Sequence, residues 1–235
     1  MEPGSRKLPQ LLKNCVAVEK VVRVKSAKIS LRRSGPSRVK PIRLLVEMNW
    51  LAHLYLSEPN AEFRVGNLLP DLTSALHLKS LPETYQRGIR CHRRIDLFTD
   101  AHPRVRACVR RFPPPYRRFG GILTDVYFDH FLTRDWSQYS TVPLPDFIGE
   151  FYRDIETCAM VMPAEAKQRL QRLREADWLG RYHHTAGVAD ILGRIGRRFR
   201  RPMDLTGSLP IFQEHETAFL EDFQSFFPEL IAHLR

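Results

Sequence analysis

Histidines and aspartates at helical spacing are the residues of this sequence best suited to chemistry. The stretch GIRCHRRIDLFTDAHP, residues 88–103, places His92, Asp96 and Asp100 four residues apart, with Arg93 and Arg94 between the first two. Side chains four residues apart lie on one face of a helix. Imidazole and carboxylate groups gathered on one face are typical of a divalent metal site.

Each of these residues also has a simpler interpretation. His92 and Asp96 would form a surface ion pair if the neighbouring arginines, Arg93 and Arg94, kept this face in solvent. Asp100 is followed by Ala-His-Pro, which is also the pattern of a helix N-cap with proline in the first turn. The spacing alone therefore leaves both the metal site and an ordinary helix surface open.

A second pair of carboxylates falls in a stretch that should be buried. Residues 120–136, GGILTDVYFDHFLTRDW, carry apolar side chains on nearly every side of the predicted helix. Asp125 and Asp129 stand one turn apart on one face, with His130 beside them. Burying two carboxylates costs several kcal/mol each unless a cation or hydrogen-bond donors compensate them, and a bound metal ion would do so.

Two earlier motifs add one candidate each. MNWLAHLYLSEP places His53 inside an apolar helix, where a hydrogen-bonded core histidine is the alternative. GNLLPDL places Asp71 directly after Pro70, which disfavours helix at Leu69 and makes a turn or cap carboxylate the alternative. Helical bundles build metal sites from such residues on successive helices. Mixed imidazole and carboxylate ligands suit manganese, iron or zinc, and the excess of carboxylates favours manganese or magnesium.

Helices must position these residues, because the apolar pattern repeats every three to four residues from Met48 onward and no hairpin or repeat signal interrupts it. The predicted helices cover residues 48–57, 60–77, 83–99, 103–111, 117–136, 145–160, 163–176, 184–199 and 208–227, with a short closing helix after Pro228. We therefore predict one compact, multi-helix, all-α domain over residues 48–235.

The net charge of +11 is concentrated in the first part of the chain. Residues 1–47 hold 12 Lys and Arg against 3 Asp and Glu, whereas the rest of the chain holds 25 against 23. This first part contains several prolines and no sustained helical period, so we expect a basic, poorly ordered tail. A transit peptide and an extension upstream of a true start at Met48 are the alternatives for this tail.

Cysteine usage and hydropathy bear on the compartment. The chain has 4 cysteines without CxxC spacing, which is typical of reduced thiols, and we therefore expect a cytoplasmic protein. The apolar stretches are all too short to cross a bilayer, so no membrane insertion is expected. The sequence leaves the oligomeric state open.

Taken in order, the motifs resemble the acyl carrier protein phosphodiesterase family, also called ACP hydrolase. The resemblance extends over residues 48–235 and is carried by MNWLAHLYLS, GNLLPDL, GIRCHRRIDLFTDAHP, DVYFDHFL and FLEDFQSFFPEL. The chain departs from the family at Pro70, where alanine is more frequent. Asp129-His130 also reverses the His-Asp order of typical HD-domain proteins, to which the family is distantly similar.

This resemblance implies an all-α fold similar to that of HD-domain phosphohydrolases and a manganese-dependent phosphodiesterase. The implied reaction hydrolyses the bond between 4'-phosphopantetheine and a serine of acyl carrier protein, which converts holo carrier to apo carrier. The metal would make water more acidic and polarise a phosphoryl oxygen. The implied metal ligands are His53, Asp71, His92, Asp96, Asp100, Asp125 and Asp129, and His130 falls on the same motifs.

The remaining roles would fall to basic residues. The serine leaving group needs a proton, for which His130, His53 or a water molecule is a candidate. Arg93 or Arg94 would neutralise nonbridging phosphate oxygens or support a metal ligand. Acyl carrier proteins are acidic, and two arginine clusters would either steer such a partner or form solvated helix faces. The clusters comprise Arg104, Arg106, Arg110, Arg111, Arg117 and Arg118, and Arg194, Arg197, Arg198, Arg200 and Arg201.

Two other functions compete with this one. An HD-like nucleotide or small-molecule phosphohydrolase would use the same metal chemistry, although the sequence contains no Walker motif. A nucleic-acid-binding protein would use the basic tail. The near balance of charge after residue 47 argues against it, so no specific nucleic-acid partner is expected.

Overall fold

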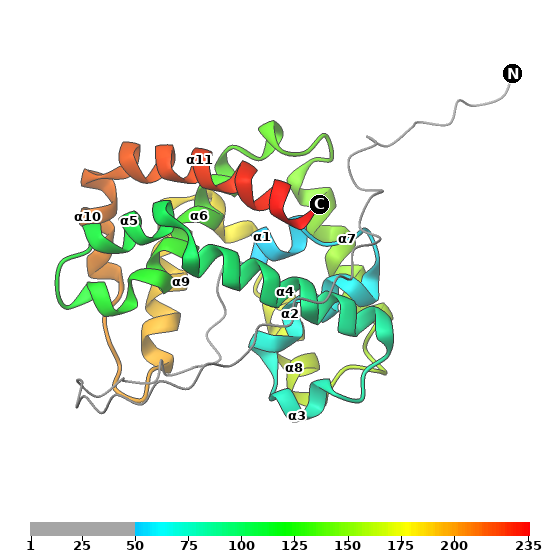
Figure 1. Ribbon diagram of the computed structural model, residues 1–235. Helices are drawn as coiled ribbons and strands as arrows, with labels where there is room; N and C mark the ends of the chain where they lie inside the picture. Colours follow the sequence, from blue (N-terminus) through cyan, green and yellow to red (C-terminus); the bar gives the residue numbers. More distant parts are fainter. Residues whose placement is uncertain (1–49) are drawn as a thin grey trace, which may run out of the picture. The chain divides into compact units, whose positions relative to one another are not determined.

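Helices make up the regular structure of residues 50–235, the part of the chain that the computed structural model describes (Figure 1). The helices are α1 Trp50–Tyr55, α2 Ala61–Leu72, α3 Ala75–Leu78, α4 Glu83–Ala101, α5 Pro103–Arg111, η2 Tyr116–Phe119, α6 Gly120–Arg134, η3 Trp136–Gln138, α7 Leu144–Thr157, α8 Ala164–Glu175, η4 Gly180–His183, α9 Thr185–Arg198, η5 Thr206–Ser208, α10 Leu209–Glu214 and α11 Glu216–Leu234. These residues contain no strand, so the predicted all-α, multi-helix fold is confirmed. The predicted tail, residues 1–47, lies outside the described residues.

The helix predicted over residues 60–77 is two helices, α2 and α3, separated at Thr73, where the backbone is extended. Pro70 was expected to disfavour helix at Leu69, but α2 continues through it to Leu72. The N–H of Thr73 donates to the carbonyl of Leu69 at 3.1 Å and closes the last turn. Leu69 and Leu72 are fully buried, and this burial outweighs the single hydrogen bond that proline removes.

The C-terminal segment also differs from its prediction. A break at His215 divides the helix predicted over 208–227 into α10 and α11. Pro228 lies inside α11 and does not start a separate closing helix. Phe227 and Leu230 are buried on either side of the proline, so the same apolar face continues across it.

Helix α4 ends at Ala101, two residues later than predicted, and this settles how Asp100 is placed. His102 is the N-cap of α5, and its Nδ1 accepts a hydrogen bond from the N–H of Arg104 at 3.3 Å. Asp100 is therefore not a helix N-cap. It continues the face of α4 that carries Asp96.

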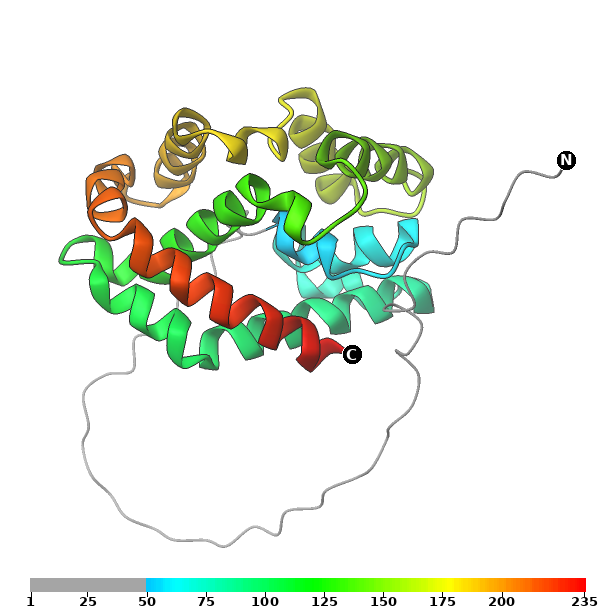
Figure 2. The same ribbon diagram turned by 90° about the horizontal axis from the view of Figure 1, so that it is seen from above.

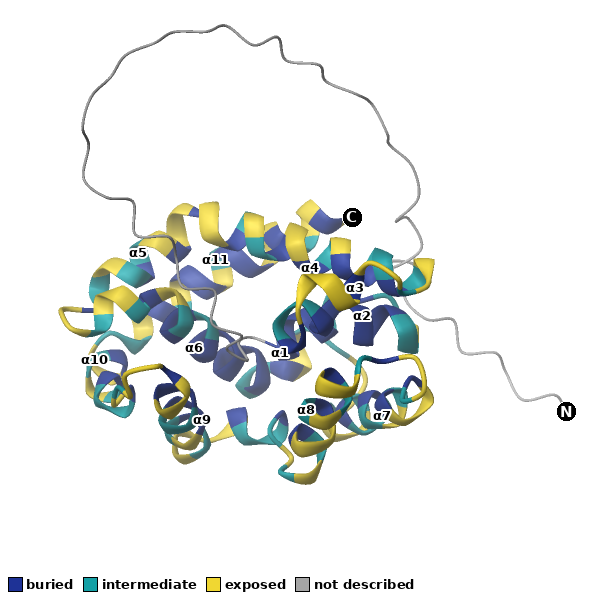
Figure 3. Cartoon of the chain, turned by 90° about the horizontal axis from the view of Figure 1, so that it is seen from below, coloured by how far each residue is buried: buried dark blue, intermediate teal, exposed yellow. Residues whose placement is uncertain are grey.

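Helix α6 lies between α9 on one side and α5 and α11 on the other (Figure 2). Most of its residues are buried (Figure 3), which confirms the prediction for the stretch that is apolar on nearly every side. Tyr127 stacks on Phe212 of α10, and Phe131 contacts Phe223 of α11. None of the described helices is long and apolar enough to span a membrane.

Helices α2 and α4 cross with their backbones in contact, and this crossing positions several of the polar residues. A Cβ atom at Gly66 would lie 2.5 Å from the carbonyl oxygen of Tyr85. A Cβ atom at Gly88 would collide with the carbonyl oxygen of Phe63 and lie 2.8 Å from the backbone nitrogen of Asn67. Glycine is required at both positions because any side chain would force the helices apart.

Replacing Gly88 with alanine is expected to destabilise the fold by about 2 kcal/mol, because its methyl group has no room between α2 and α4. Chemical unfolding of the Gly88→Ala protein measures the loss. Gly121→Ala, in α6, is the matched control, because nothing lies within 4 Å of a Cβ atom there. Equal stability of the two variants would contradict the close crossing.

Candidate active site

Two buried histidines from different helices pack against each other and face one carboxylate. The rings of His53, in α1, and His92, in α4, lie 4.4 Å apart between centroids, and both side chains are buried. Asp96 follows His92 by one turn. Its Oδ1 lies 3.5 Å from Nε2 of His53, and its Oδ2 lies 3.1 Å from Nε2 of His92. His92 and Asp96 are therefore not an isolated surface ion pair.

A single residue of α2, Asn67, orients both imidazole rings. Nδ1 of His53 donates to Oδ1 of Asn67 at 3.0 Å, and Nδ1 of His92 donates to the backbone oxygen of Asn67 at 2.7 Å. Nδ2 of Asn67 donates to the backbone oxygen of His53 and to Oγ of Ser57, each at 2.8 Å, which fixes the orientation of the amide. A carbonyl oxygen only accepts, so each Nδ1 carries a hydrogen and each Nε2 is left to face Asp96.

A cation fits between these groups. A neutral imidazole presents a lone pair at Nε2, and a lone pair that faces a carboxylate needs a proton or a cation between them. Nε2 of His53 is buried and has no hydrogen-bond partner among residues 50–235. Ligand atoms of His53, His92 and Asp96 all lie within 4.8 Å of one another. These three residues are therefore suited to hold a divalent metal ion.

The pKa shifts of His53 and Asp96 describe the same site without a metal. Burial acts to lower the pKa of His53, but Asp96 and Asp71 outweigh it, and the pKa is raised above its ordinary value. Burial acts to raise the pKa of Asp96, but His53 and His92 outweigh it and hold the pKa well below its ordinary value. In the absence of a metal ion, Asp96 therefore favours a proton on Nε2 of His53. A cation that binds Nε2 of His53 must displace that proton.

Asp71 lies beside this group, in the last turn of α2. Its Oδ1 is 3.6 Å from Nε2 of His92, and its Oδ2 accepts a hydrogen bond from Nε1 of Trp50 at 3.1 Å. Burial raises the pKa of Asp71, against the opposing effects of His92 and His53. Because Pro70 is accommodated within α2, the departure from the family pattern leaves Asp71 on the helix and next to His92.

Asp100 and Asp125 extend the acidic group along α4 and α6. Burial and the charges of Asp96 and Asp100 raise the pKa of Asp125 well above its ordinary value. Burial and the charge of Asp96 also raise the pKa of Asp100, and Arg106 opposes the effect. These mutual effects show that both carboxyl groups lie near Asp96. Six of the seven expected metal ligands therefore lie in one group, namely His53, Asp71, His92, Asp96, Asp100 and Asp125.

Asp129 is bound to the backbone of α1. Its Oδ2 accepts from the N–H of Leu51 and its Oδ1 from the N–H of Ala52, each at 3.0 Å. Burial raises its pKa to about 7, against the effect of these two hydrogen bonds. Both oxygens therefore hold the first turn of the helix that carries His53. Asp129 was expected as a metal ligand, and that role stays a prediction; in the structure its carboxylate positions α1.

His130, the expected proton donor, lies outside this group. Its Nδ1 donates to the backbone oxygen of Tyr182 at 2.7 Å, and its ring meets Phe212 edge to face. Burial lowers its pKa, and the charged groups that modify this effect are Arg134, Glu216 and His183. None of these residues belongs to the histidine and aspartate group, so His53 is the histidine that lies at the site.

Arg93 and Arg94 are both exposed on α4 but lie on different sides of it. Arg93 precedes Asp96 by three residues, which places it on the neighbouring surface of the helix. Nη2 of Arg94 donates to the backbone oxygen of His233, in α11, at 2.8 Å. Arg93 is therefore the arginine at the edge of the site, and Arg94 joins two helices.

Asn67 and Trp50 were not among the residues expected at the site, although both lie in motifs that predicted it. Asn67 is the polar residue that precedes the apolar pair Leu68 and Leu69 in GNLLPDL. A buried amide must find hydrogen-bond partners, and this was the available signal. Its partners come from α1 and α4, so the spacing within α2 did not reveal them.

Manganese binding is expected to weaken as the pH falls, because the proton on His53 competes with the metal for Nε2. The pKa of His53 is raised above 6.5, so the loss of affinity should begin above that pH and increase below it. Calorimetric titration with Mn²⁺ in two buffers of different ionisation enthalpy measures affinity and proton release together. Asn67→Ala frees the ring of His53 and should weaken binding by about tenfold to a hundredfold. Affinity that does not change with pH would contradict this assignment.

Comparison with known proteins agrees with the motifs. Residues 48–230 match the protein family described as acyl carrier protein phosphodiesterase. Proteins of that name from Photorhabdus laumondii and Yersinia pestis are 34% and 32% identical to this chain over 185 residues, which cover 78% of this chain and 93% and 96% of the relatives. No solved structure matches, so the likeness to HD-domain phosphohydrolases stays a prediction. The chain belongs to the acyl carrier protein phosphodiesterase family.

Proposed function

We propose that this chain hydrolyses the phosphodiester between 4'-phosphopantetheine and the serine of holo acyl carrier protein, in a metal-dependent reaction that yields apo carrier. Family membership supports the substrate and the reaction class. The metal dependence is supported by the geometry of His53, His92 and Asp96. The observation that carries it is the buried Nε2 of His53, which faces Asp96 without a hydrogen-bond partner among the described residues.

His53, His92 and Asp96 would hold the ion, with Asp71 and Asp100 beside them. The excess of oxygen ligands favours manganese or magnesium, and the imidazole nitrogens also suit iron or zinc, so we expect manganese first. When bound, the ion polarises a phosphoryl oxygen and makes water a stronger acid. Asn67 keeps both Nε2 atoms directed at the ion by holding each Nδ1 hydrogen.

The serine oxygen that leaves needs a proton, and Asp125 is suited to provide it. Burial and the charges of Asp96 and Asp100 raise the pKa of Asp125 well above its ordinary value, which favours the protonated form of its carboxyl group. A carboxyl group of this kind can act as a general acid. Asp125 replaces His130 in this role, because His130 contacts the backbone oxygen of Tyr182 and not the site.

Intact mass spectrometry of the carrier protein tests the reaction. Holo carrier incubated with the full chain and Mn²⁺ is expected to lose the whole phosphopantetheine group, and a sample with chelator is expected to keep it. Asp96→Asn removes the charge that faces both histidines and should slow the release by about a hundredfold or more. Glu175→Gln, at an exposed position of α8, is the matched control. If the folded, manganese-loaded chain leaves holo carrier intact, the proposal fails and a small-molecule phosphohydrolase takes its place.

Arg93 and Arg94 form a second comparison within α4. Arg93→Ala is expected to lower kcat/KM for holo carrier by about tenfold, because a guanidinium at the edge of the site neutralises nonbridging phosphate oxygens. Arg94→Ala should leave kcat/KM nearly unchanged, because its side chain is bound to the backbone oxygen of His233. Steady-state kinetics of the two variants measures both effects, and equal losses would remove Arg93 from substrate binding.

A further inference from the structure

The two arginine clusters of the sequence are used differently by the fold. In the first cluster, Arg104 and Arg111 pair with the buried carboxylate of Asp222 at 3.2 and 2.6 Å. Arg106 and Arg117 each donate through Nε to a backbone oxygen, at 3.1 and 2.9 Å. Much of this cluster therefore stabilises α5 and its neighbours.

The second cluster remains at the surface. Arg197, Arg200 and Arg201 are exposed, and no carboxylate among residues 50–235 pairs with them. Arg194 is half-buried, and its Cζ lies over the ring of Trp178, 4.7 Å from the centroid. We call Arg194, Arg197, Arg200 and Arg201 the α9 basic surface.

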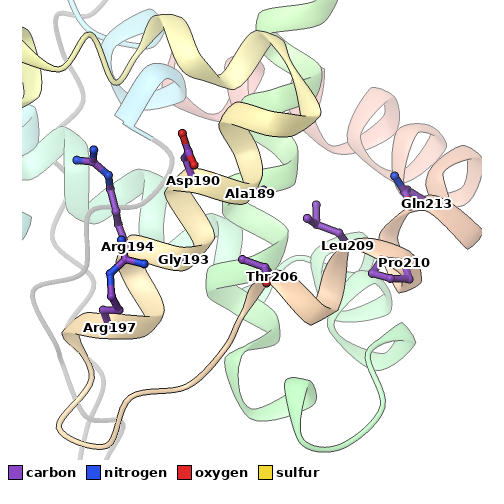
Figure 4. Close-up of a pocket in the computed structure, with 9 residues that line it drawn as sticks. All are labelled: Ala189, Asp190, Gly193, Arg194, Arg197, Thr206, Leu209, Pro210 and Gln213. Atoms are coloured by element: carbon purple, nitrogen blue, oxygen red, sulfur yellow. The ribbon is translucent and has the colours of Figure 1, made fainter.

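This surface borders a groove of about 740 Å³ between α9 and the segment formed by η5 and α10 (Figure 4). Gly193 forms part of its floor, where a Cβ atom would lie 3.4 Å from Nη1 of Arg197 and 3.7 Å from Cγ2 of Thr206. Leu209 and Pro210 line the α10 side. The groove therefore has a cationic side and an apolar side.

Asp190 also lines the groove, but it does not neutralise the positive charge of Arg194 and Arg197. Its Oδ2 pairs with Nη1 of Arg181 at 3.0 Å, outside the α9 basic surface. The groove is far larger than a single ion requires. It matches a protein segment that carries both carboxylate and apolar side chains.

We propose that the groove and the α9 basic surface dock an acidic protein segment, and that this segment belongs to the carrier protein. The identity of the partner rests on the proposed function, and its charge is opposite to that of the surface. Helix α9 contacts α6, which carries Asp125, so the groove lies one helix away from the candidate site. Complementary charge of this kind increases association and is weakened by salt.

The test compares two double variants with the same change in net charge. Arg194→Glu with Arg197→Glu alters the groove, and Arg153→Glu with Arg172→Glu alters exposed positions of α7 and α8. The groove variant should bind holo carrier at least about tenfold more weakly than the control at low salt, and the difference should shrink as salt rises. Fluorescence anisotropy of labelled holo carrier, titrated with the full chain in the presence of a metal chelator, measures binding without turnover.

Gly193→Leu provides a second variant that changes no charge. Leucine would fill the floor of the groove and favours helix more than glycine does, so the helix should persist. Binding should weaken by a similar factor, and this loss should not depend on salt. In kinetics, the groove variants should raise KM for holo carrier while kcat stays close to that of the wild-type chain.

The two proposals fail in different ways. If the wild-type chain binds the carrier and releases phosphopantetheine, but both groove variants bind as the control does, the docking proposal is wrong and the proposed function stands. If the wild-type chain does not bind the carrier, the docking proposal is wrong. If it binds without releasing phosphopantetheine in the presence of Mn²⁺, the proposed function is wrong. The comparison of the groove variants with the control then still tests whether the groove docks the carrier.

Discussion

The close crossing of α2 and α4 is the constraint on which the candidate site depends. Gly66 and Gly88 let the two backbones touch, and Asn67 lies at the point of contact. From there its backbone oxygen reaches His92 in α4, and its side chain reaches His53 in α1. One residue therefore sets the orientation of two rings that come from two other helices. A wider crossing would separate these groups even if every helix kept its length.

Four carboxylates of the fold lie in four different surroundings, and comparing them shows what is distinct about the site. Asp222 is compensated by two arginines, and Asp129 by two backbone N–H groups. Asp96 faces two imidazole rings, while Asp125 is surrounded by other acidic charges. The first two arrangements are complete within the protein. The last two depend on protons or on a cation, which is the property expected of a site that binds and releases a ligand.

Much of the fold was predictable because helical periodicity is a local property. The helix at 103–111 was predicted with its observed bounds, and the helices at 145–160 and 184–199 lie within three residues of α7 and α9. The face shared by His92 and Asp96 also followed from their spacing. Burial across the two prolines, at positions 70 and 228, was not predictable because it depends on which helices lie opposite.

The roles of the site residues were also hard to predict, because they depend on contacts between helices. Asp125 and Asp129 occupy one face of α6 and have the same spacing as His92 and Asp96, yet one lies with the acidic group and the other binds the backbone of α1. His130 is next to Asp129 in sequence but turns toward Tyr182. Residue type and spacing identified the candidates. Contacts with residues from distant parts of the chain distinguish the candidates that lie in the acidic group from those that hold another helix in place.

The contact between Asp129 and α1 also bears on how the protein folds. Helix α1 has six residues, and a helix of that length is unstable alone in water. The carboxylate that holds its first turn lies 77 and 78 positions away in sequence from the two amides that it binds. Closing a loop of this size comes at an entropic cost that only later contacts repay. The placement of His53 therefore depends on a contact between distant parts of the chain, because α6 holds the short helix that carries it.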